Sequence, residues 1–106
     1  MTFAQVEEVM ERVFDECRAL RLAGAKEYAH REENSFANFE RVGESLGLSR
    51  EAVLLVYLLK HIDGISAYVQ GHRSQREDIR GRINDAIVYL LLLRGMVEEV
   101  RQEPGV

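Results

Sequence analysis

The sequence predicts an all-α protein, a four-helix bundle with three long members. Apolar residues recur at spacings of three and four along almost the whole chain, and no segment alternates apolar and polar residues as a half-buried strand would. Cap residues and glycines separate the periodic segments. The length of 106 residues suits one domain, spanning 1–106, with a tail at 101–106 that contains Pro104 and Gly105.

The first predicted helix covers residues 3–30. Its apolar residues form a heptad-like stripe, made by Phe3, Val6, Met10, Val13, Cys17 and Leu20. Phe14 widens the stripe, and the small residues 23–25 permit close approach of another helix. Gly24 lowers helix stability by about 1 kcal/mol relative to Ala, so the helix can bend there.

Residues 31–34 read as a turn, and a short helix is predicted over 35–46. Gly47 followed by Leu48 suits a left-handed C-terminal cap. Ser49 suits the N-cap of a third helix over 50–70, which stops at Gly71.

The fourth predicted helix begins at 74–77, where Ser-Gln-Arg-Glu forms a capping box, and runs to about Arg101. On a helical wheel its core stripe is predicted to consist of Ile79, Ile83, Ala86, Leu90, Leu93 and Val97. Arg82, Asp85 and Tyr89 fall together on a neighbouring flank. An aspartate at the edge of an apolar helix needs a partner, since an unpaired charge beside a core is costly.

Composition excludes several classes of protein. The net charge of −4 argues against a general nucleic-acid binder, which usually carries a basic excess. One cysteine cannot form an internal disulfide, and the longest apolar run, 86–93, is far shorter than the roughly 20 residues that span a membrane. The acidic N-terminus does not resemble a signal peptide. We therefore expect a cytoplasmic protein that is not embedded in a membrane.

Two helices carry more apolar surface than a small monomer can bury. Residues 52–59 and 86–93 are apolar around most of the helix circumference. This surplus predicts a homo-oligomer, a dimer or a tetramer.

If the third and fourth helices are antiparallel neighbours, residues 60–63 lie level with residues 82–85. Lys60, Asp63, Arg82 and Asp85 are then expected to form a polar cluster between apolar helix bodies. One interpretation is a buried ion-pair network that sets the helix register. The other is a ligand site, with cations for phosphate and carboxylates for a metal.

A second set of candidates lies at 32–39. Phe36 and Phe39 are one turn apart, and Asn34 and Asn38 lie beside them. These residues suit a core with ordinary caps, and they equally suit a flat base, held by stacking and by amide hydrogen bonds. The three histidines lack the spacing of a zinc site, and Cys17 lies on a core stripe, where it is not expected to be a nucleophile.

Several short motifs resemble the MazG-like all-α nucleotide pyrophosphohydrolases, and in particular small members common in phages and their hosts. They are Asp85-Ala-Ile-Val-Tyr89-Leu, Lys26-Glu-Tyr28, residues 34–39, Lys60-His61 with Ile65, and Arg82-Ile-Asn-Asp85. The resemblance covers about residues 24–100.

In that family, Glu-x-x-Glu on one helix and Glu-x-x-Asp on the next bind magnesium, which neutralises the triphosphate and activates water. The resemblance therefore implies Asp63 and Asp85 as Mg²⁺ ligands and catalytic residues. The other two acidic positions are occupied by Lys60 and Arg82, and such cations bind phosphate directly.

The expected nucleotide-binding set is Lys60, His61, Arg82, Phe36, Asn38, Phe39 and Tyr89. Lys60 and Arg82 are assigned to phosphate, and Phe36, Asn38 and Phe39 to the base. The favoured function is nucleotide binding, with pyrophosphohydrolase activity if the two aspartates hold magnesium. The alternatives are a non-catalytic phage or bacterial protein that sequesters a nucleotide, such as a defence signal, and a purely structural oligomeric protein.

Overall fold

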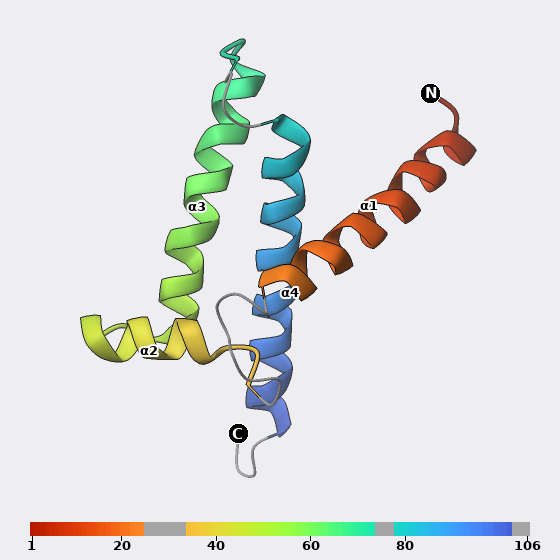
Figure 1. Cartoon of the computed structure of the whole chain (residues 1–106). Coiled ribbons are helices and arrows are strands. Elements are labelled where there is room, and N and C mark those ends of the chain that lie inside the picture. Colours follow the sequence, from red (N-terminus) through yellow and green to blue (C-terminus); the bar gives the residue numbers. More distant parts are fainter. Residues whose placement is uncertain (25–33, 74–77, 103–106) are drawn as a thin grey trace.

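The computed structural model describes residues 1–24, 34–73 and 78–102, and this part of the chain is helical without strands. The helices are α1 (Phe3–Gly24), α2 (Ala37–Leu46), α3 (Arg50–Val69) and α4 (Ile79–Gln102) (Figure 1). The all-α prediction is confirmed. The predicted extension of the first helix over 25–30, most of the turn at 31–34 and the capping box at 74–77 lie outside the described residues, as do Lys26 and Tyr28.

Side-chain caps fix where α1 begins. The Thr2 hydroxyl accepts a hydrogen bond from the Gln5 backbone N–H at 3.1 Å, and the Gln5 amide oxygen accepts one from the Thr2 backbone N–H at 2.7 Å. This reciprocal pair satisfies two donors that a helix start otherwise leaves free. It was not anticipated from the sequence.

The connection between α2 and α3 follows the predicted caps. Gly47 adopts a left-handed conformation with φ 72°, and the Leu48 N–H donates to the Gly43 carbonyl at 2.9 Å. The Ser49 hydroxyl then accepts from the Ala52 N–H at 3.1 Å and caps α3. These two caps turn the chain within three residues.

The helices do not all run side by side. α3 and α4 form an antiparallel pair, α2 lies across the beginning of α3, and α1 packs only against α4 among the described helices (Figure 1). The first turns of α1 point away from the other three helices. The predicted antiparallel α3–α4 neighbours are therefore present, whereas α1 stands partly outside the bundle.

The core lies where α2, α3 and α4 meet. Leu54 and Met96 are fully buried, and Phe39 and Val53 complete the central cluster. On α4 the side chains that are buried or packed on this cluster are Ala86, Tyr89, Leu92, Leu93 and Met96.

The predicted core stripe of α4 is wrong in part. Ile83, Leu90 and Val97 are 41%, 51% and 42% exposed. At roughly 100° per residue, the buried face is rotated by about 80° from the predicted one. It coincides with the flank that carries Asp85 and Tyr89, so that flank faces inward.

One described helix, Arg50–Val69, is long and apolar enough to cross a membrane, judged by its length and composition alone. The core helix of a soluble protein passes the same test. Lys60, His61 and Asp63 lie within this helix, and charged side chains are costly at the centre of a bilayer. The cytoplasmic location remains a prediction.

Candidate functional site

A pocket of about 250 Å³ lies between the C-terminal end of α1, the start of α2, and the middle parts of α3 and α4. We call it the central pocket. Its polar lining consists of Arg21, Ser35, Asn38, Tyr57, Asp85 and Tyr89, and its apolar lining includes Leu20, Phe39, Val88 and Leu92. Four residues singled out in the sequence, Asn38, Phe39, Asp85 and Tyr89, therefore meet at one site.

Aromatic rings form one side of the central pocket. The ring centroids of Phe39 and Tyr57 are 5.9 Å apart, those of Phe39 and Tyr89 are 6.2 Å apart, and those of Tyr57 and Tyr89 are 6.3 Å apart. These separations are typical of favourable edge and tilted aromatic contacts. Phe39 is buried in the core cluster and also lines the pocket, whereas its contact with a base stays a prediction.

Asp85 enters the pocket beside a buried histidine. The side chain of His61 is 10% exposed, and its Nδ1 lies 3.6 Å from Oδ2 of Asp85. This distance is too long for a hydrogen bond, so Nδ1 has no hydrogen-bond partner among the described residues. The imidazole stacks on Tyr89, with centroids 5.5 Å apart and an interplanar angle of 28°. His61 thus supports Asp85 and Tyr89 from the core side.

Guanidinium groups lie at and near the mouth of the pocket. Nη2 of Arg21 donates to the Ser35 hydroxyl at 3.1 Å, which joins the end of α1 to the segment before α2. Nη2 of Arg41 donates to Oδ1 of Asn38 at 2.8 Å. The pocket lining therefore contains a carboxylate from α4, Asp85, and a cation from α1, Arg21, while Arg41 contacts the lining residue Asn38 from outside.

Cys17 and Asn84 hold α1 against α4. The thiol lies 3.8 Å from the Asn84 carbonyl oxygen, and the Asn84 amide donates to Glu16 at 2.8 Å. Burial raises the pKa of the Cys17 thiol, and the nearby carboxylates of Glu16 and Asp85 raise it further. A thiol that keeps its proton is a poor nucleophile, which agrees with the structural role expected from the sequence.

Lys60 and Asp63 do not join Asp85. The predicted register is right, because His61 lies opposite Asp85 and Gly64 lies opposite Arg82. However, the residues of α3 that face α4 here are His61 and Gly64, whereas the side chains of Lys60 and Asp63 are exposed. Asp63 follows His61 by two residues, or about 200° around the helix, and therefore points away from Asp85.

This arrangement does not fit a magnesium ion shared by Asp63 and Asp85. Within the described part of the chain, no group of three or more His, Cys, Asp or Glu side chains could hold a metal ion. Asp85 on α4 lines the central pocket, whereas Asp63 is exposed on the surface of α3. Asp63 thus does not face Asp85, and magnesium binding by these two aspartates stays a prediction.

The side chain of Arg82, on α4, packs against α3 at Gly64. A side chain at Gly64 would place its Cβ 2.6 Å from Cζ of Arg82, so the glycine provides the space that the sequence suggested. Arg82 lines a different pocket, of about 450 Å³, together with Tyr68, His72 and Arg73 near the turn between α3 and α4. It does not line the central pocket.

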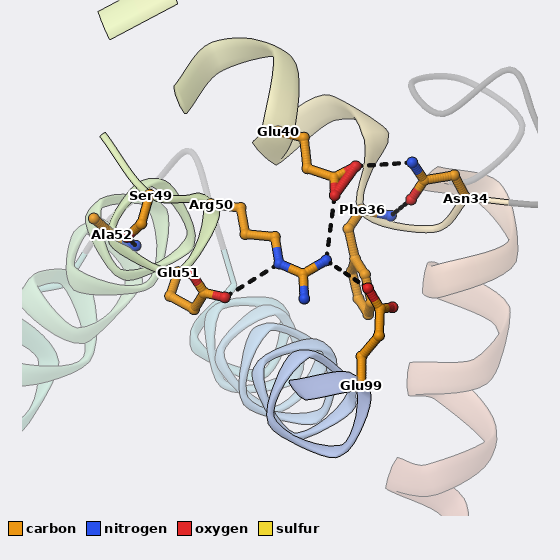
Figure 2. A network of polar contacts seen from close by, with 8 residues as sticks. All are labelled: Asn34, Phe36, Glu40, Ser49, Arg50, Glu51, Ala52 and Glu99. Carbon is orange, nitrogen blue, oxygen red and sulfur yellow. Dashed lines mark hydrogen bonds and ion pairs between the residues drawn. The ribbon is translucent and has the colours of Figure 1, made fainter. Parts of the chain in front are cut away.

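Phe36 packs into a structural network and does not line the central pocket. Its ring lies 5.1 Å below the guanidinium of Arg50, and a Cβ at Gly95 would lie 3.1 Å from it. Arg50 binds Glu40, Glu51 and Glu99 at 3.0–3.2 Å (Figure 2). The network ties α2, α3 and α4 together, as expected of a register-setting ion-pair cluster, but around a residue that the sequence analysis did not select.

Asn34 completes the same network. Its Oδ1 accepts from the Phe36 N–H at 3.0 Å, and its Nδ2 donates to Glu40 at 2.8 Å (Figure 2). Asn34 therefore closes an Asx turn directly before α2.

Two pocket residues, Arg21 and Tyr57, were missed. Tyr57 precedes His61 by four residues and Gly64 by seven, so all three share one face of α3, but it lies inside a run interpreted only as apolar surface. Arg21 follows Cys17 by four residues, one turn further along α1. Helical spacing from residues already selected would have found both.

No family model, curated protein or solved structure matches the chain. The resemblance to MazG-like proteins therefore depends on the short motifs alone.

Proposed function

We propose that the protein binds a nucleotide in the central pocket without hydrolysing it. The supporting observation is the convergence of Asn38, Phe39, Asp85 and Tyr89 on one pocket. These residues come from two separate sequence motifs, one at 34–39 and the other at 85–89. Aromatic rings beside an amide and a carboxylate suit a flat base.

The size and charge of the pocket suggest an orientation. Its volume of about 250 Å³ is below the roughly 300 Å³ at which ligand pockets usually begin, so it suits the base and leaves the sugar and phosphates at the mouth. Asp85 repels phosphate and accepts hydrogen bonds, and we therefore place it at the edge of the base. Arg21 is the pocket cation suited to phosphate.

Asp85 also suggests a preference among bases. Adenine, cytosine and guanine carry an exocyclic amine that can donate to a carboxylate, whereas uracil and thymine offer only a ring N–H. We therefore expect nucleotides with an exocyclic amine to bind more tightly. A difference of one charge-assisted hydrogen bond is worth about 1.5–3 kcal/mol.

Hydrolysis is not included in the proposal, because Asp63 is exposed on a face of α3 that points away from Asp85. Binding without cleavage agrees with the replacement of two acidic family positions by Lys60 and Arg82. A cytoplasmic phage or bacterial protein that sequesters a nucleotide fits these features. If no nucleotide binds in the following experiment, a purely structural role is the alternative.

The test is a thermal-shift screen of common nucleotides, linear and cyclic, with and without magnesium. A ligand that binds only the folded state at 100 times its Kd adds about 2.7 kcal/mol of stability, which raises the melting temperature by roughly 10 °C or more in a domain of this size. We expect at least one nucleotide to do so without magnesium.

A matched pair of arginine variants locates the binding site. Arg21 lines the pocket, whereas Arg18 is 80% exposed and pairs with Asp15 on α1. Arg21→Gln should reduce the thermal shift, and Arg18→Gln should not. The proposal is overturned if no nucleotide stabilises the protein, if every shift requires magnesium, or if the two variants behave alike.

A further inference from the structure

An apolar stripe on α1 is uncovered in the single chain. Phe3, Val6, Met10 and Phe14 are 83%, 42%, 43% and 46% exposed, although they follow heptad-like spacing. Cys17 is the only buried residue of α1. The stripe therefore faces solvent over the half of the helix that lies away from α4 (Figure 1).

A helix in this position needs a partner to be stable. Isolated helices shorter than about 12–15 residues are marginal in water, and most helical stability in proteins comes from packing of an apolar face. The first turns of α1 point away from the other three helices, and most of their residues are exposed (Figure 1). Their amphipathic pattern indicates packing that one chain does not supply.

The total surface gives the scale of the missing contact. A folded monomer of 12.2 kDa is expected to expose about 6,100 Å², whereas this chain exposes 8330 Å². The difference of about 2,200 Å² is a total for all 106 residues, and it is of the same order as the roughly 1,000–2,500 Å² that each subunit buries in large obligate homodimers.

The chain also carries a second exposed stripe, which can serve as the counterpart. On α3, Leu55, Leu59 and Ile62 are 48%, 49% and 38% exposed and share one face. If α1 of each chain covers this face of the other, both stripes are buried in a closed two-fold dimer. Such a dimer would cover both apolar stripes without a further partner.

We propose that a second copy of this chain covers the α1 stripe formed by Phe3, Val6, Met10 and Phe14, through its own α3 stripe. This inference is independent of the nucleotide proposal. It identifies the dimerisation surface, which the sequence placed on the third and fourth helices only.

Sedimentation of the full chain at micromolar concentration tests the proposal. Met10→Glu puts a charge in the stripe, and Ala19→Glu puts the same residue on the opposite, exposed face of α1. We expect the parent and Ala19→Glu to sediment at twice 12.2 kDa or more. Met10→Glu should sediment as a monomer with reduced helix content.

Hydrogen exchange separates dissociation from unfolding. Met10 does not touch the core formed by α2, α3 and α4, so the amides of α3 and α4 should remain protected in Met10→Glu while those of Phe3–Phe14 lose protection. The proposal is overturned if the parent is a monomer with a protected α1. It is equally overturned if Met10→Glu remains as associated as Ala19→Glu.

Discussion

Removing the charge of Arg50 should loosen the junction of three helices. Arg50 is the first residue of α3, and its side chain is only 15% exposed. It lies 3.2 Å from Glu40, 3.1 Å from Glu51 and 3.0 Å from Glu99, and its guanidinium covers the ring of Phe36 at 5.1 Å (Figure 2). Arg50→Gln keeps much of the length of the side chain but removes these ion pairs and the cation–π contact.

The exposure of the carboxylates limits the loss of stability that Arg50→Gln should cause. Breaking a fully buried ion pair costs about 3–5 kcal/mol, and an exposed pair contributes about 0–1 kcal/mol. The three glutamates are 40%, 41% and 53% exposed, so water can solvate them once Arg50 is gone. With about 0.5–1 kcal/mol for the cation–π contact, we expect a loss of about 2–3 kcal/mol.

Urea and thermal unfolding, followed by circular dichroism at one protein concentration, would measure this loss. It corresponds to a fall of roughly 10–20 °C in melting temperature for a domain of this size. Arg94→Gln is the control, because Arg94 is 72% exposed and pairs with Glu98 within α4. That change should cost less than about 0.5 kcal/mol. If both variants are equally stable, the Arg50 network does not hold the helices together.

Three further predictions concern other parts of the fold. Cys17 should resist alkylation in the native protein. Because burial raises the pKa of the thiol in the folded state, the free energy of unfolding should fall as the pH rises through the ordinary thiol range. Cys17→Ala should not show this fall. Gly43→Ala should lower the melting temperature, because the new Cβ would lie 2.5 Å from the Leu48 carbonyl oxygen. At Gly81 a Cβ would meet no atom within 4 Å, so Gly81→Ala should stabilise the protein by up to about 1 kcal/mol. Leu59→Glu should dissociate the dimer in sedimentation, and an intact dimer would show that α3 is not the counterpart of α1.

Local signals in the sequence were sufficient for the four helices and for the turn between α2 and α3. Gly47 and Ser49 act through their own backbone and neighbouring residues, so the turn between α2 and α3 could be predicted without tertiary information. The face that α4 buries could not be predicted in the same way. Because residues 86–93 are apolar on all sides, periodicity does not select one face, and packing against α3 decides it.

The candidate site, too, could be predicted only in part from the sequence. The antiparallel register between α3 and α4 was predictable from turn length, and it brought Asp85 opposite the 60–63 segment. Which side chains of that segment face inward depends on helix rotation, which buries His61 and exposes Lys60 and Asp63. Spacing alone treats these three residues as equivalent neighbours, so it could not show that Asp63 points away from Asp85.

The most direct test of nucleotide binding in the central pocket compares two aspartate variants by calorimetric titration. Asp85 lines the pocket, and Asp63 is exposed on another face of the α3–α4 pair. With the nucleotide that gives the largest thermal shift, Asp85→Asn should weaken binding at least about tenfold, as expected for the loss of a charge-assisted hydrogen bond. Asp63→Asn should bind as the parent does, with or without magnesium. Equal effects of the two substitutions, or tighter binding by Asp85→Asn, would contradict the proposed site.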